Sequence, residues 1–139
     1  MAKISGLGDS FQLDDSGGTL RDISSTVDSV QVGTSQGLIE VTGLDKSAME
    51  RIIGMGDGSF QISGPFDAAT NKAHDVMTPL SGTRTATYDI GGATTGNPRL
   101  SMEMLIANYN ISRDNAGKLN WTSTLNLANG TVPTWSTVP

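Results

Sequence analysis

The pentapeptide at residues 33–37 (GTSQG) has the G-x-S-x-G pattern in which hydrolases place a nucleophilic serine. That chemistry needs a strand before the motif, a helix after it and a histidine that activates the serine. Here the residues that follow predict a strand, and the sole histidine, His74, falls on a predicted helix. We therefore interpret the pentapeptide as a hairpin turn and His74 as a solvated helix residue.

Other patterns that could bind a phosphate or a cation each lack a required part. The glycines at 54, 56 and 58 are not followed by the Lys-Ser or Lys-Thr pair of a P-loop. Asp14, Asp15 and Asp57 offer oxygen ligands for calcium, but the twelve-residue loop with its closing glutamate is missing. The absence of cysteine excludes a thiolate nucleophile and a Cys-ligated zinc. We predict no catalytic residue, no dedicated metal site and no cofactor.

The charge of the chain argues against tight nucleic-acid binding. Fourteen acidic residues against nine Lys and Arg give a net charge of −5, the wrong sign for displacing counterions from a phosphate backbone. The few aromatic residues are scattered and lack interleaved basic residues, so they do not form a base-stacking surface. DNA is therefore not expected as a specifically bound ligand.

Length and composition predict one thinly packed domain. Leu, Ile, Val and Phe make up only about a fifth of the 139 residues, whereas Ser and Thr are abundant. A fold with so many hydroxyl groups leaves a broad polar surface for water or a partner. The sequence has neither an apolar leader nor a run of the roughly 20 apolar residues that a membrane helix requires. We expect synthesis in a cytoplasm and no membrane partner.

The elements that must position any site are mostly strands. Apolar residues recur at every second position in short runs broken by Gly, Asp and Asn, which predicts half-buried strands joined by tight turns. The strand at 99–112 is long enough to suggest a bulge or a projecting ribbon. The predicted strands cover residues 10–14, 20–23, 27–33, 38–42, 59–66, 83–90, 99–112 and 118–129. This pattern favours a β-sandwich or a strongly curved sheet.

Two helices are predicted between these strands. Ser47 and Glu50 have the spacing of a capping box, which predicts one or two helical turns between residues 45 and 53. The glycine-rich residues 54–58 are expected to break the chain there. The principal helix is predicted at 67–78, capped by Asp67 and ended by Pro79.

Several short motifs follow one another in a recognisable order. They are residues 3–6 (KISG), 10–15 (SFQLDD), 20–24 (LRDIS), 40–45 (EVTGLD), 64–67 (GPFD), 83–85 (TRT) and 96–98 (GNP), followed by a final Trp-containing strand. This succession resembles the major tail proteins, which form the tail tube of long-tailed bacteriophages. The likeness spans most of the chain, and none of its motifs is catalytic.

The resemblance implies a mainly β fold: a β-sandwich or curved sheet with one flanking α-helix, six copies of which close into a ring with a composite β-barrel lumen. Stacked rings would form a tube in the virion, through which DNA passes into the host without specific binding. The implied partners are other copies of the chain and the tape measure, tail terminator and distal tail proteins. No enzymatic activity is implied.

We expect a single tail-tube domain over residues 1–139, with subunit contacts made by an N-terminal arm at about 1–9, a loop at about 42–58 and a C-terminal tail at about 131–139. The candidate contact residues are Leu7, Leu44, Met49, Ile52, Met55, Trp135 and Val138. A channel that passes DNA should present carboxylates and few cations. The candidate lumen-facing carboxylates are Asp28, Glu40, Asp89 and Glu103, with solvated outer-face charges as the alternative interpretation.

Three other functions stay open at this point. The chain could be a neighbouring tail component, such as a tail-completion or baseplate-hub protein or the inner tube of a contractile system. It could be a free-standing β-sandwich binding module, which would expose an aromatic stripe and stay monomeric. A Ser35 hydrolase would lose its activity on Ser35→Ala.

Overall fold

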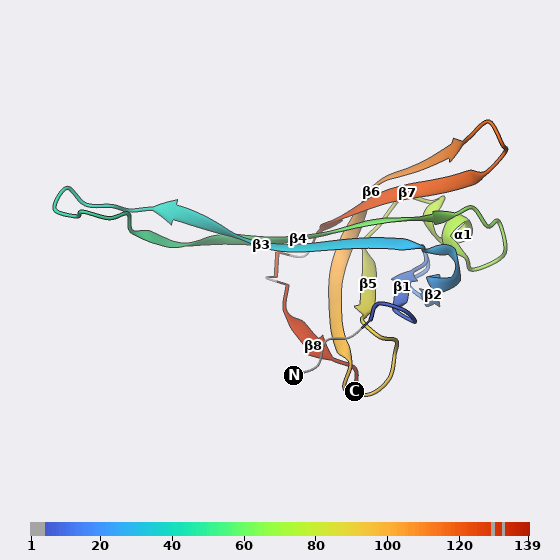
Figure 1. Ribbon diagram of the computed structural model, residues 1–139, viewed down its shortest axis with the longest axis horizontal. Coiled ribbons are helices and arrows are strands. Elements are labelled where there is room, and N and C mark those ends of the chain that lie inside the picture. Colours follow the sequence, from blue (N-terminus) through green and yellow to red (C-terminus); the bar gives the residue numbers. More distant parts are fainter. Residues whose placement is uncertain (1–4, 129, 132) are drawn as a thin grey trace.

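The computed structural model describes residues 5–128, 130–131 and 133–139, and most of them lie in antiparallel strands. The strands are β1 (Ser10–Asp14), β2 (Leu20–Asp22), β3 (Ser29–Glu40), β4 (Arg51–Pro65), β5 (Arg84–Asp89), β6 (Pro98–Arg113), β7 (Leu119–Leu127) and β8 (Trp135–Thr137). They form one sheet in the order β2-β1-β5-β6-β7-β4-β3, with β8 paired to the start of β6 (Figure 1). The prediction of a mainly β fold is confirmed. The predicted end of the strand at 118–129, Asn129, lies outside the described residues.

Strand β6 joins two parts of the sheet. Its first half pairs with β5, from Arg99 to Met104, and its second half pairs with β7, from Met104 to Arg113. The register shifts between Ile106 and Asn108, where a bulge bends the strand. Beyond the bulge, β6 and β7 continue as a hairpin that projects from the body (Figure 1). The length of the predicted strand therefore did reflect both a bulge and a projecting ribbon.

The core lies on one face of the curved sheet and follows the period-two pattern. Trp121 is fully buried at its centre and donates its indole N–H to the carbonyl oxygens of Thr26 and Pro65, at 3.0 and 3.1 Å. The ring of Phe11 stands edge-on against that of Phe60, with 5.3 Å between centroids. The other buried core residues are Leu13, Ile23, Ile62, Ala73, Val76, Met77, Ala86, Leu100, Met102, Met104, Ile106 and Leu125.

The helix is where the sequence predicted it, but it is shorter. Helix α1 covers only Ala73–Met77, and its buried residues close one side of the core. Asp67 does not cap it; its side chain accepts the Ala69 N–H at 2.9 Å in a separate turn. Asn71 then adopts a positive φ of 65°, which interrupts any helix that starts at Asp67. His74 is not simply solvated, because its Nδ1 hydrogen-bonds the Tyr109 hydroxyl at 3.0 Å.

The largest departure from the predicted elements is at residues 33–58. In place of a turn at 35–37, a helix near 45–53 and a break at 54–58, the chain forms one long hairpin of β3 and β4. Its loop, residues 41–50, has no helix, because the Glu50 N–H is taken by the Thr42 hydroxyl at 2.9 Å. The capping-box pattern therefore lies at an exposed hairpin tip, where a short helix would have no core to pack against.

The glycines in this hairpin explain why the prediction failed. Gly37 is the single residue opposite Gly54 and Met55 at a bulge in β4, where the register shifts between Gln36 and Leu38. A Cβ on Gly37 would lie 2.9 Å from the Met55 carbonyl oxygen, and one on Gly58 would lie 2.6 Å from the Met102 sulfur. These glycines permit close approach inside a sheet, and local sequence does not distinguish that role from a turn.

Candidate interaction surfaces

The β3–β4 hairpin extends far beyond the rest of the sheet. Strand β7 pairs with β4 only from Ser59 to Pro65, so residues 35–57, which we call the arm, have no third strand beside them. Figure 1 shows the arm as a two-stranded ribbon that leaves the body at the end remote from α1. A two-stranded ribbon without a packed face is marginally stable in water.

The arm is apolar on both of its faces. Leu38 pairs with Ile53, and the next pair, Ile39 with Ile52, points to the opposite face because side chains alternate along a strand. All four side chains are more than half exposed. The exposed large apolar residues of the arm are Leu38, Ile39, Val41, Leu44, Met49, Ile52, Ile53 and Met55. Neither face is covered by the described part of the chain, so the arm is a candidate interaction surface.

The predicted contact residues fall into three groups. Leu44, Met49, Ile52 and Met55 all lie on the arm, where Met55 is 90% exposed. The other four exposed apolar residues of the arm were not among the predicted contacts, although the alternation on both strands indicates them once the hairpin is recognised. Leu7 at 88% and Trp135 at 45% are exposed at separate places.

Val138 is a correction to the predicted contact set. Only 7% of Val138 is exposed, and its backbone N–H donates to the Asn97 carbonyl at 2.9 Å. Its own carbonyl accepts the Gly96 N–H at the same distance. The tail is thus hydrogen-bonded to the loop before β6 of its own chain, and little of the surface of Val138 is accessible to a neighbouring copy.

The opposite side of the sheet from the core carries an uncharged polar surface over β3, β4, β7 and β6. One row runs straight across the four strands as Gln31, Gln61, Thr124 and Asn108. Two parallel rows flank it. We call these positions the neutral face: Ser29, Gln31, Gly33, Ser59, Gln61, Ser63, Leu105, Asn108, Asn110, Thr122, Thr124 and Asn126. All are exposed or half-buried, and a shallow hollow of about 220 Å³ lies over its centre.

No charged residue of the described chain belongs to the neutral face, but Asp57 and Glu103 continue the same side of the sheet two residues beyond Ser59 and Leu105. The Lys and Arg residues of the described chain lie on the arm, on β2 and β5, at the start of β6, beside α1 and at the β6–β7 turn. They are Arg21, Lys46, Arg51, Lys72, Arg84, Arg99, Arg113 and Lys118. A phosphate group at the neutral face would therefore meet hydroxyl and amide groups without meeting an ammonium or guanidinium.

The four carboxylates predicted to face a lumen do not share one surface. Asp28 is exposed just before β3, and Glu40 is exposed on the arm. Glu103 is half-buried on β6 and accepts a hydrogen bond from the Thr85 hydroxyl. The prediction is wrong for Asp89, which is 0% exposed. Its carboxylate receives Arg99 Nε at 2.6 Å and the Arg99 guanidinium nitrogen at 3.0 Å, a pairing that compensates its burial.

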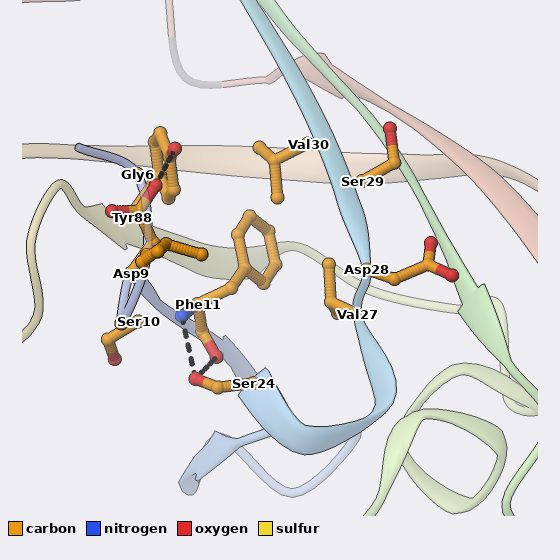
Figure 2. A pocket seen from close by; sticks show the side chains of 12 residues that line it. Gly6, Asp9, Ser10, Phe11, Ser24, Val27, Asp28, Ser29, Val30 and Tyr88 are labelled. Atoms are coloured by element: carbon orange, nitrogen blue, oxygen red, sulfur yellow. Dashed lines mark hydrogen bonds between the residues drawn. The ribbon is translucent and has the colours of Figure 1, made fainter.

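A cavity of about 610 Å³ lies between the N-terminal segment and the start of β3. Figure 2 shows Phe11 standing between Tyr88 on one side and Val27 on the other. The Tyr88 hydroxyl donates to Asp9, whose second oxygen accepts the Gly91 N–H at 2.6 Å. Burial, and then this hydrogen bond, raise the pKa of Tyr88 to about 12. The lining of the cavity thus combines apolar side chains with the Tyr88 hydroxyl and the Asp9 carboxylate.

The described residues do not assemble the other sites that the motifs suggested. Ser35 lies in the arm, paired with Asp57, whereas His74 lies on α1 in the body. Within the described ranges, no three His, Asp or Glu side chains gather closely enough to hold a metal ion. No helix in that part of the chain is long and apolar enough to cross a membrane.

Comparison with solved structures finds the same fold in chains of tail and baseplate particles. A chain in the tail of an empty gene transfer agent particle, solved with helical refinement and C6 symmetry, matches with a TM-score of 0.74 and 14% identity, over 99% of this chain and all of that one. A chain in the virion of the native gene transfer agent particle matches with a TM-score of 0.71 and 15% identity over the same shares.

A third match is a chain in the six-fold symmetrised baseplate of the anti-feeding prophage, with a TM-score of 0.66 and 10% identity, over 99% of this chain and 97% of that one. No protein-family model and no curated protein matches the chain. At these identities the likeness is one of fold. The chain has, over nearly its whole length, the fold of subunits found in phage-type tails and baseplates, as the resemblance implied.

Proposed function

We propose that this protein is a tail-tube subunit, with a structural rather than an enzymatic role in a virion. In this proposal, six copies close into a ring, and stacked rings form a hollow tube through which DNA leaves the particle. The observation that carries the proposal is the arm, which is apolar on both faces and uncovered in the single chain. The C6 symmetry of the matching gene transfer agent tail supports the ring number.

The arm has the properties of a contact between different copies. Because its two faces are both apolar, covering them requires a partner on each side, and one neighbouring surface cannot supply both. A ring uses a head-to-tail interface in which each subunit offers two different surfaces, and stacking of rings in one direction adds two more. An arm packed between two other copies satisfies that need, and burial of its eight large apolar side chains favours assembly.

Unpaired strand edges offer a second kind of contact. Strand β3 is at one end of the sheet order, so the backbone groups on its outer edge have no strand partner among the described residues. Pairing of this edge with a strand of the next copy would continue the sheet around a ring. The other tail proteins, namely the tape measure, terminator and distal tail proteins, would then meet the first and last rings.

Electron microscopy of the purified protein over a range of concentrations tests the proposal. We expect hollow tubes whose length increases with concentration and whose cross-section contains six subunits. A protein that stays monomeric at millimolar concentration would contradict it. Ser35→Ala serves as a matched variant, because the arm keeps its apolar side chains and tube formation should be unchanged.

A second candidate is a baseplate or tail-completion component, favoured by the match to the anti-feeding prophage baseplate chain. Such a protein would stop at a single ring, whereas a tube subunit adds rings without limit. Analytical ultracentrifugation separates the two, because a ring gives one sedimenting species and a tube gives a broad, concentration-dependent distribution.

A further inference from the structure

We infer that the two exposed methionines of the arm, Met49 and Met55, are a modification site, at which a peroxide converts the thioether to a sulfoxide and thereby blocks assembly. The inference rests on the proposed tail-tube function, because it concerns a surface that is buried between copies in that proposal. It adds an oxidation-sensitive step that acts on the subunit before the tube forms.

The accessible sulfur atoms of the described chain are confined to the arm. Met49 is 56% exposed and Met55 is 90% exposed. The other methionines of the described ranges, Met77, Met102 and Met104, lie in the core, and none of them is more than 4% exposed. A thioether has no proton to lose before it reacts, so its oxidation requires only access to the sulfur. A peroxide therefore reaches the arm first and leaves the core intact.

The reaction needs a two-electron oxidant such as hydrogen peroxide. A lone pair of the sulfur attacks one peroxide oxygen, and the O–O bond breaks as the S–O bond forms. A proton passes from the transferred oxygen to the departing one, which leaves as water. The sulfur is oxidised and the peroxide is reduced. The product is a polar, chiral side chain in place of an apolar one.

The guanidinium of Arg51 lies beside one of the two sulfur atoms. Its Nη2 donates to the Met49 Sδ at 3.2 Å, although a thioether sulfur is only a weak acceptor. An oxygen added to this sulfur lies within reach of the same guanidinium and accepts a charge-assisted hydrogen bond from it. Arg51 is exposed, so this bond forms while the arm is in water. The unassembled arm thus stabilises the oxidised form of Met49.

Assembly has the opposite preference. In the proposed tube the arm packs between two other copies, and both sulfur atoms are removed from water. Burying the Met55 sulfoxide, or the Met49 sulfoxide together with Arg51, desolvates polar groups that the thioethers do not have or do not hold as strongly. Neither methionine belongs to the core cluster of the body. Oxidation of the arm therefore opposes assembly without unfolding the subunit, and assembly in turn shields the sulfur atoms from oxidation.

Mild treatment of the unassembled protein with hydrogen peroxide tests the inference. Peptide mapping by mass spectrometry measures the sulfoxide at each methionine, and pelleting measures the concentration needed for tube formation. The matched variant combines Met49→Leu with Met55→Leu, which keeps apolar side chains of similar volume and retains every other methionine. Methionine sulfoxide reductases for both epimers, supplied with dithiothreitol as the reductant, reverse the modification.

We expect sulfoxide at Met49 and Met55 before it forms at the core methionines, and a rise of at least about tenfold in the concentration needed for tube formation. The reductases should restore the original concentration. The double leucine variant should assemble equally well with and without peroxide. When tubes are oxidised after assembly, Met55 should react more slowly than it does in free subunits.

Normal tube formation by subunits that carry sulfoxide at both arm positions would overturn the inference. An equal loss of assembly in the peroxide-treated leucine variant would also overturn it, because the damage would then lie elsewhere in the chain. If the untreated protein forms no tubes, the proposed function itself fails, and electron microscopy of the untreated sample distinguishes that result.

Discussion

Gly64 lies where β4 passes under the backbone of Thr26, and the space between them has no room for a methyl group. A Cβ at this position would be 1.9 Å from the Thr26 carbonyl oxygen and 2.9 Å from the Val27 Cα. The same oxygen accepts the indole N–H of Trp121, so moving it also disturbs the centre of the core. A single residue type is therefore required at this position.

We expect Gly64→Ala to lower the free energy of unfolding by about 2–3 kcal/mol, because the backbone must shift to relieve the overlap. The matched control is Gly33→Ala, also on the β3–β4 pair, where a Cβ meets only the Ser59 hydroxyl at 3.7 Å. That control should be unchanged or more stable by up to about 1 kcal/mol. Urea denaturation of the unassembled proteins measures both, and equal stability of the two variants would refute the packing argument.

The raised pKa of Tyr88 predicts how the stability of the folded protein changes at high pH. Its pKa is raised from 10.0 to about 12, so above pH 10 the folded protein holds this proton more tightly than the unfolded chain. The stabilisation is complete below pH 10 and is lost as the pH rises toward 12. Melting temperatures measured across this window should fall less steeply for Tyr88→Phe than for the unmodified protein. Asp9→Asn, which keeps the burial, should leave most of the slope; parallel curves for Tyr88→Phe and the unmodified protein would contradict the assignment.

At the scale of elements, the arm is separable from the body that carries it. The core cluster draws on β3 and β4 only from Val30 to Val32 and from Phe60 to Ile62, whereas the apolar pairs of the arm contact no third strand. The stability of the body should therefore depend little on arm side chains, while assembly should depend on them strongly.

We expect Met55→Asp to abolish tube formation while the unassembled protein keeps its melting temperature to within a few degrees. Met55 is 90% exposed in the single chain, so the charge costs little until a neighbour covers it, when desolvation of the carboxylate opposes assembly. Met55→Leu is the control and should still assemble. Sedimentation and differential scanning calorimetry report the two quantities, and tubes formed by Met55→Asp at the normal concentration would show that the arm lies outside the contacts.

For the whole molecule, net charge and apolar contacts predict the effect of salt. Each copy carries a net charge of −5, so copies repel one another at low ionic strength. Raising the salt concentration toward about 0.15 M shortens the screening length to about 8 Å and weakens that repulsion without weakening apolar burial. The concentration needed for tube formation, measured by pelleting, should fall as salt rises. Tubes that dissolve as salt rises would instead indicate that ion pairs between subunits hold them together.

The sequence by itself determined the local conformation of much of the sheet. The alternation of apolar and polar residues placed β1, β5 and β7 within a residue or two of their observed bounds. The one exception is the predicted end of β7 at Asn129, which lies outside the described residues. The sequence also located the helix before Pro79. It also separated the core face from the polar face along β7. This succeeds because a strand's period-two pattern depends only on which face is buried. The composition likewise predicted a thin core and a broad polar surface.

Tertiary structure alone decided which group several positions contact. Gly37 and Gly58 look like turn residues in the sequence but permit close approach within β3 and β4. Asp89 looks like a free carboxylate until β6 places Arg99 opposite it. Val138 looks like a loose apolar end until the loop at Asn97 accepts its N–H. In each case the partner lies on another strand or loop, and the local pattern of residues carries no record of a partner that only the folded chain brings near.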